Sequence, residues 1–107
     1  MVRVVEYLDD GGRSPFADWF NRLDSLAALK VRRAVARMEL GNFGDSKSVG
    51  RGVVECRIDI GPGYRVYYGR DGEELVILLA GGAKKRQQKD IEAAQRCWAA
   101  YKVRKKG

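Results

Sequence analysis

The sequence predicts a single α+β domain in which helices pack on one face of an antiparallel sheet. Segments rich in β-branched and aromatic residues, bounded by turns rich in glycine and aspartate, indicate strands at residues 2–8, 53–60, 64–69 and 75–80. Apolar residues at helical spacing fill the stretches between and after them. A chain of 107 residues has room for one core. The expected order is one strand, two helices, three strands and a last helix.

The first helix is expected to begin at Ser14-Pro15, because serine is a preferred N-cap and proline suits the first turn. The apolar residues that follow at spacing i, i+3, i+4, i+7 are Phe16, Trp19, Phe20 and Leu23. We interpret this stripe as part of the core rather than as an aromatic binding site.

A second helix, capped by Asp24 or Ser25, is expected to run to about Leu40 and to end at Gly41. Its inner face carries Ala28, Val31, Val35 and Met38. Another face carries three cations at spacing i, i+3, i+7, namely Lys30, Arg33 and Arg37. These cations either contact phosphate or form an ordinary solvated helix face.

The segment from Asn42 to Gly52 is rich in glycine and serine and is predicted to be a loop. Its basic residues, Lys47 and Arg51, can reach a substrate that binds on the sheet. The three strands that follow are predicted to form an antiparallel meander, joined by Gly61-Pro62-Gly63 and by an Asp71-Gly72 turn.

Gly81-Gly82 is expected to end the meander, and a last helix is expected from about Gln88. Asp90 and Glu92 suit its first turn, where the helix dipole favours negative charge. Its buried stripe consists of Ile91, Ala94, Trp98 and Tyr101.

The alternation of side chains along a strand decides which residues share a face. In the first two strands of the meander the even-numbered residues are nearly all apolar and form the core face: Val54, Cys56, Ile58, Ile60, Tyr64, Val66 and Tyr68. The odd-numbered residues fall on the other face: Glu55, Arg57, Asp59, Arg65 and Tyr67. If Ile60 lies opposite Tyr64, Asp59 lies across from Arg65. On spacing alone, this face is either a ligand site or a structural ion pair with a tyrosine packed over it.

The positive charge of the chain is local. Residues 1–83 hold 12 Lys/Arg and 12 Asp/Glu, whereas residues 84–107 hold 9 Lys/Arg and 2 Asp/Glu. Such a cluster favours a phosphate backbone or an acidic protein partner, whereas residues 103–107 taken alone are better explained as a solubilising tail. The chain has no histidine, and its two cysteines lack metal-ligand spacing, so no metal and no cofactor are expected. No apolar run reaches the length of a membrane span, which favours a cytoplasmic protein.

Several short motifs occur in a specific order: S-P-F-x-x-W-F, V-E-C-R-I, G-P-G-Y-R-V-Y-Y, L-L-A-G-G-x-K and Q-x-K-D-I. In their order and spacing the chain resembles the RelE/ParE superfamily of toxin–antitoxin toxins, and within it the HigB-like branch of addiction module killer proteins. The resemblance covers almost the whole chain. It implies a RelE/ParE-like β-α-α-β-β-β-α fold over residues 1–107.

The resemblance also implies a function and its partners. Many relatives are endoribonucleases that cut messenger RNA, commonly on the ribosome. Their antitoxin is typically a helix-turn-helix protein from the neighbouring gene. Arg65 matches the arginine tied to phosphate binding, Arg57 matches a second basic position, and Lys84 lies where relatives place a catalytic or substrate-contacting side chain. Ala83 departs from the family pattern, because relatives of this branch often have an acid there.

RNA can be cut by its own 2′-hydroxyl, provided that the protein aligns this oxygen, stabilises the phosphorane charge and protonates the leaving 5′-oxygen. Without histidine, electrostatic stabilisation must carry most of the catalysis. Arg65 is expected to bind the transition-state phosphate with support from Arg57. Lys84 would stabilise charge or act as the acid, Glu55 is the candidate base, and Tyr67 would stack on a base or transfer a proton.

The expected RNA-binding residues are Lys85, Arg86, Lys47 and Arg51. Two other functions fit the same sequence. A ParE-like inhibitor of DNA gyrase shares the fold and would leave messenger RNA intact while DNA breaks accumulate. A non-enzymatic nucleic-acid-binding module would show salt-sensitive binding without growth arrest.

Overall fold

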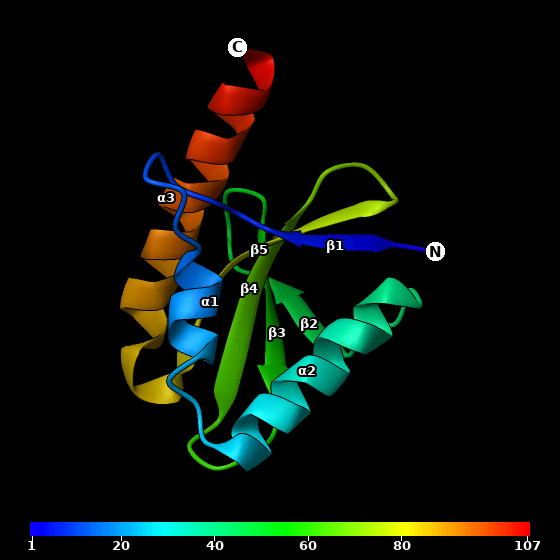
Figure 1. The fold of residues 1–107 in the computed structure, drawn as a ribbon, viewed down its shortest axis with the longest axis vertical. Coiled ribbons are helices and arrows are strands. Elements are labelled where there is room, and N and C mark those ends of the chain that lie inside the picture. The colour runs from blue at the N-terminus through cyan, green and yellow to red at the C-terminus, as the bar shows by residue number, and fades with distance from the viewer.

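The structure is a computed structural model that describes residues 1–107, and it confirms the α+β class. The elements in chain order are β1 (Arg3–Glu6), α1 (Pro15–Phe20), α2 (Ser25–Glu39), β2 (Asp45–Ser48), β3 (Val53–Ile58), β4 (Tyr64–Arg70), β5 (Leu75–Ala83), the 3₁₀ helix η1 (Lys84–Arg86) and α3 (Gln87–Lys106). Figure 1 shows α1 and α2 on one side of the sheet and α3 along the other. No helix combines the length and the apolar composition that crossing a membrane requires.

The sheet has five strands in the order β1-β5-β4-β3-β2, and it differs from the predicted sheet in two ways. It is mixed rather than antiparallel, because β1 runs parallel to β5. The segment predicted to be a loop contains the edge strand β2, which pairs antiparallel with β3. The sequence of β2, DSKS, lacks the apolar alternation that marks a strand, so its position depends on backbone pairing. The β3–β4–β5 meander is confirmed.

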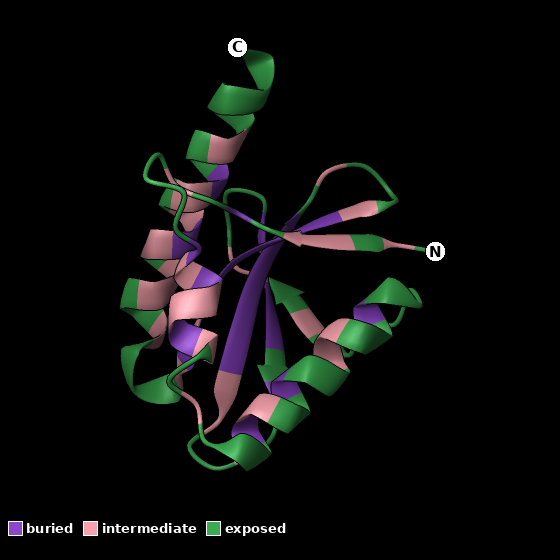
Figure 2. Ribbon diagram, in the orientation of Figure 1, coloured by how far each residue is buried: buried purple, intermediate pink, exposed green.

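Helices cover both faces of the sheet rather than one. One core cluster joins α1 and α2 to the even-numbered side chains of β3 and β4, among them Cys56 and Val66. A second cluster joins α3 to the opposite face, where Trp98 packs with Tyr67 and Ile77. Because β4 and β5 are covered on both sides, they are the most continuously buried elements in Figure 2. The face expected to bind a ligand is therefore covered by α3 over part of its area.

The starts of the first two helices are confirmed. The Ser14 hydroxyl accepts a hydrogen bond from the Ala17 N–H at 3.0 Å. The Asp24 carboxylate accepts one from the Ala27 N–H at 2.9 Å. Each cap satisfies a backbone donor that the helix itself leaves free, which fixes where the helix begins.

Gly81-Gly82 does not end β5. Both glycines lie within the strand, and their lack of a side chain makes room for the helices that pack on either face. A β-carbon on Gly81 would lie 2.1 Å from the Trp19 ring of α1, and one on Gly82 would lie 1.9 Å from the Asp90 carboxylate of α3. The two glycines face opposite layers because adjacent strand residues alternate. Leu79 is an extra residue that shifts the register between the Tyr68↔Leu78 and Tyr67↔Ala80 pairs, and this shift decides that Gly81 faces α1 and Gly82 faces α3. The strand continues past them to Ala83.

The far end of α3 is tied to the β4–β5 turn through Asp71. Tyr101 donates its hydroxyl proton to Asp71 at 2.6 Å, and the Lys105 ammonium lies 2.5 Å from the other carboxylate oxygen. These two hydrogen bonds lower the pKa of Asp71 below its ordinary 3.8. The same carboxylate raises the pKa of Tyr101 from 10.0 to about 12.

This tether is expected to stabilise the fold only between its two titrations. The lowered pKa of Asp71 means that its contribution is lost as the pH falls below 3.8. The raised pKa of Tyr101 means that its contribution is lost as the pH rises from 10.0 to about 12. Asp71→Asn is therefore expected to lower the melting temperature at neutral pH, with a difference from wild type that shrinks at both extremes. Glu73→Gln, an exposed change in the same turn, is the control and should leave the melting temperature unchanged.

Candidate functional site

The strands β3 and β4 place four of the predicted site residues on one face. Glu55 pairs with Tyr67 and Arg57 pairs with Arg65 in the register between the two strands. The expected Asp59–Arg65 ion pair is absent, because Ile58 rather than Ile60 lies opposite Tyr64. Asp59 is exposed beyond the end of β3. The assignment of faces from alternation is confirmed, and the predicted register is wrong by two residues.

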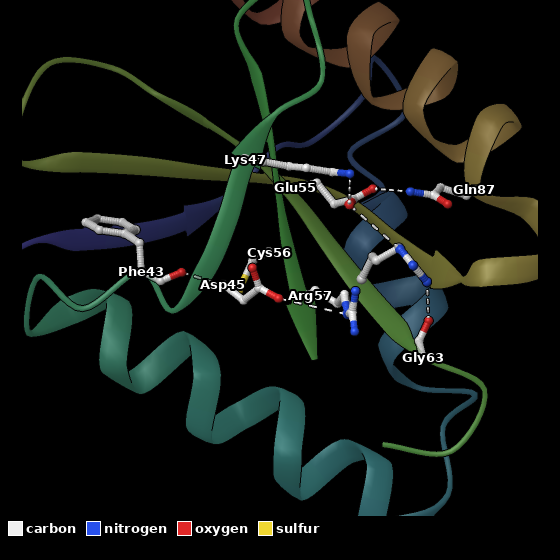
Figure 3. A network of polar contacts seen from close by, with 9 residues as sticks. Phe43, Asp45, Lys47, Glu55, Cys56, Arg57, Gly63 and Gln87 are labelled. Atoms are coloured by element: carbon white, nitrogen blue, oxygen red, sulfur yellow. Dashed lines mark hydrogen bonds and ion pairs between the residues drawn. The ribbon is translucent and has the colours of Figure 1, made fainter. Parts of the chain in front are cut away.

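Glu55 is the centre of a polar group on this face. Its side chain is only 2% exposed, and its Oε2 accepts a hydrogen bond from the Gln87 amide at 2.8 Å. Its Oε1 lies 3.8 Å from Arg65 Nε and 4.0 Å from Lys47 Nζ. Figure 3 shows Glu55 between Lys47 of β2 and Gln87 at the start of α3. A buried carboxylate therefore has two cations near one oxygen and an amide donor on the other.

Arg65 is buried but not fully used by the protein. Its Nη1 donates to the Gly63 carbonyl at 2.6 Å, whereas its buried Nε makes no hydrogen bond. Its Nη2 makes no hydrogen bond within the chain, and this nitrogen is accessible to solvent. The Gly63 carbonyl also accepts from the Lys84 backbone N–H at 3.1 Å. One carbonyl thus joins Arg65 to the first residue of η1.

Tyr67 lies on the same face as Glu55 and is closed off from solvent. The whole residue is 0% exposed, and its hydroxyl is enclosed without a hydrogen-bond partner. Burial, and then the neighbouring Glu55 carboxylate, raise the pKa of Tyr67 above its ordinary value of 10.0. Solvent does not reach the ring, so stacking on a base would require the residues that cover it to move. The proton-transfer role stays a prediction, because a hydroxyl that keeps its proton can still donate it.

The other predicted basic residues are divided between two places. Lys84, Lys85 and Arg86 form η1 and are exposed next to the site. Arg57 is about half exposed, and its Nε lies 3.9 Å from the Asp45 carboxylate. Arg51 lies elsewhere, in a hollow that it shares with Gln95, Arg96 and Lys102 of α3. The structure thus brings every predicted RNA-binding residue except Arg51 near the face that carries Glu55 and Arg65.

Two comparisons relate this chain to known proteins. Residues 18–99 match the sequence profile of the family described as "Phage derived protein Gp49-like (DUF891)". The chain belongs to this Gp49-like family. An uncharacterized protein of Haemophilus influenzae (strain ATCC 51907 / DSM 11121 / KW20 / Rd) is 48% identical over 81 residues, which cover 75% of this chain and 82% of that relative. The expected relation to toxin–antitoxin toxins is confirmed at the level of the family, which is a family of toxin-like modules.

Two α3 residues of this Gp49-like protein complete the site and were missed by sequence reasoning. Gln87 holds Glu55, and Asp90 lies over Gly82, the strand partner of Arg65. Burial raises the pKa of Asp90 above its ordinary 3.8. One sequence feature could have pointed to them. Glu55 and Arg65 are charged residues within otherwise apolar strands, and buried charges need polar partners. The sequence did not indicate which segment would supply these partners.

The arrangement in this Gp49-like protein suits proton abstraction next to a bound anion. Glu55 Oε1 accepts no hydrogen bond, so it is free to take a proton, while the Gln87 amide fixes the orientation of the carboxylate. Arg65 Nη2 and the Arg57 guanidinium are the nearby donors for phosphate oxygens. The exposed cations of η1 add positive potential at the same edge.

Proposed function

We propose that this protein is the toxin of a HigB-like toxin–antitoxin module and that it is a metal-independent endoribonuclease. It cleaves messenger RNA in the cytoplasm, in association with the ribosome, and thereby stops translation and growth. The observation that carries this proposal is the Glu55 carboxylate, oriented by Gln87 and placed next to Arg65 in a chain without histidine. Family membership supports a partner antitoxin, which we expect to be a helix-turn-helix protein from the adjacent gene.

The cleavage step follows from the positions of these groups. Glu55 Oε1 takes the proton of a 2′-hydroxyl, whose oxygen attacks the adjacent phosphorus while the bond from phosphorus to the 5′-oxygen breaks. Arg65 Nη2, supported by Arg57, stabilises the charge on the phosphorane oxygens. Lys84 stabilises the leaving 5′-oxygen or protonates it. The products are a 2′,3′-cyclic phosphate and a free 5′-hydroxyl.

We expect Lys47 to move aside when substrate reaches Glu55. The Lys47 side chain is 69% exposed, and its ammonium lies 4.0 Å from the carboxylate, a distance that allows ion pairing but no hydrogen bond. A long exposed side chain held by one loose contact moves at little cost. Lys47 thus covers Glu55 in the free protein and becomes available to phosphate once RNA arrives.

The proposal predicts new messenger RNA ends that carry a 5′-hydroxyl. The wild-type chain and an Arg65→Lys variant would each be expressed under an inducible promoter, and 5′ ends would be mapped with and without prior kinase treatment. We expect ends that depend on kinase treatment and that arise only with the wild type. Intact messenger RNA together with accumulating DNA breaks would overturn the proposal in favour of gyrase inhibition. Salt-sensitive RNA binding without growth arrest would overturn it in favour of a binding module.

A further inference from the structure

A basic cavity lies on the other side of β3, away from Glu55. It has a volume of about 250 Å³ and is formed between α2 and the edge of the sheet at β2 and β3. The cations that line it are Lys30, Arg33 and Arg37 of α2 and Arg57 of β3. Cys56 and Ile58 also line it, as do two acids, Asp45 and Asp59. At about 30 Å³ per water molecule, the cavity has room for roughly eight waters, enough for a phosphate group but not for a folded peptide segment.

The three α2 cations have no carboxylate partner in the protein. The six ion pairs of the chain include none of them, and among the cavity cations only Arg57 has an acid within reach, Asp45 at 3.9 Å. Like charges three and four residues apart on a helix destabilise it, and Lys30, Arg33 and Arg37 have this spacing. Their convergence on one cavity therefore works against the free protein and is relieved by a bound anion.

The walls of the cavity favour a phosphate over a base. Phe43 is the aromatic side chain that lines it, and this ring stacks on Tyr68 with centroids 5.7 Å apart. The Arg70 guanidinium also lies over the Phe43 ring, 4.4 Å from its centroid. A ring already in contact with Tyr68 and Arg70 offers little surface for a nucleobase, so recognition here depends on charge.

Arg57 links this cavity to the Glu55 group. It lines the cavity, and it is the strand partner of Arg65. Figure 3 shows the Asp45–Arg57 pair between Glu55 and α2. A chain of phosphates that crosses the edge of the sheet at Arg57 would therefore pass from one cation cluster to the other.

We propose that the cavity between α2 and β3 binds a backbone phosphate of the RNA substrate next to the phosphate that is cleaved. This inference rests on the proposed ribonuclease function and extends it, because it gives the substrate a second anchoring point. Binding at the cavity is independent of base sequence. Arg57 contacts both phosphates, and it exchanges Asp45 for RNA when the substrate arrives.

The test measures the salt dependence of RNA binding by the full chain. The probe is a fluorescent single-stranded RNA of twelve nucleotides with 2′-O-methyl groups, which cannot be cleaved by 2′-hydroxyl attack, so binding is measured separately from catalysis. Lys30→Gln, Arg33→Gln and Arg37→Gln are combined in one variant. Each phosphate contact contributes about 0.7 to the slope of log K against log salt concentration for single strands, so we expect the slope to fall by about 0.7 or more.

The matched control removes the same charge elsewhere on the surface, by combining Arg3→Gln, Arg22→Gln and Arg32→Gln, and should keep the wild-type slope. Asp59→Asn removes an acid from the cavity and should tighten RNA binding, an opposite change that loss of folding cannot produce. Equal slopes for the cavity and control variants would overturn the proposal. So would a cavity variant that keeps its affinity for RNA but loses its affinity for the antitoxin. If wild type binds RNA through the cavity but cleaves nothing, the ribonuclease proposal fails and the phosphate site stands.

Discussion

Arg65→Lys is expected to lower the rate of RNA cleavage by about 10²–10³-fold, the usual effect of losing one donor that stabilises charge in a transition state. Lysine keeps a positive charge beside Glu55 but cannot reproduce a planar fork that reaches Gly63 and the substrate at once. The rate would be measured on a purified ribosome–messenger complex, with melting curves for both proteins.

Lysine is a better test than alanine because Arg65 and Glu55 are both buried. Removing one partner of a buried ion pair typically costs about 3–5 kcal/mol, so Arg65→Ala would combine loss of stability with loss of function. Arg22→Lys, a change at an exposed arginine that forms no ion pair, is the matched control and should cleave at the wild-type rate. Full activity in Arg65→Lys would show that Arg65 has a structural role only.

Glu55→Gln is expected to reduce cleavage by about 10²–10⁴-fold, the contribution that a general base usually makes. Glutamine has nearly the same shape, and its carbonyl oxygen can still accept the hydrogen bond from the Gln87 amide. It cannot take the proton of a 2′-hydroxyl. Single-turnover rates separate this chemical step from RNA binding, which should change little.

Glu92→Gln serves as the control, because Glu92 is an exposed acid on α3. Gln87→Ala adds a second readout. It leaves the base in place but removes the donor that orients it, so it should lower the rate less than Glu55→Gln does. A Glu55→Gln variant with wild-type single-turnover rates would assign the base to another group, and Asp90 would be the first residue to examine.

Local alternation in the sequence was sufficient to assign the faces of β3 and β4. Cys56 and Val66 belong to one core cluster, while Glu55 and Arg65 lie on the opposite face, as a period of two requires. The helix caps at Ser14 and Asp24 could also be predicted from the sequence, because capping depends on residues only three positions apart.

The register between β3 and β4 could not be predicted from the sequence. The segment around Gly61-Pro62-Gly63 contains turn signals that suit loops of several lengths, and the strands close at the Ile58↔Tyr64 pair, two residues earlier than expected. This shift replaces Asp59 by Glu55 as the acid that faces Arg65. The correct acid was among the candidates, but its importance depended on a pairing that local sequence does not determine.

The contribution of α3 to the site could not be predicted from local sequence either. Gln87 is 32 positions away from Glu55, and only the packing of α3 on β5 and β4 brings the two side chains together. The same packing buries Tyr67, whose alternation with Glu55 and Arg65 had suggested an accessible ring. Alternation predicts the face on which a side chain lies, but not what covers that face.

The extra residue in β5 has a consequence for how length changes would act on this protein. Leu79 reverses the alternation of every residue after it, so Gly81 faces α1 and Gly82 faces α3. A deletion of Leu79 would remove the bulge and restore strict alternation against β4, so Gly81 would still face α1 and Gly82 would still face α3. The bulge is therefore a point at which β5 can lose one residue while each helix keeps a residue without a side chain beneath it.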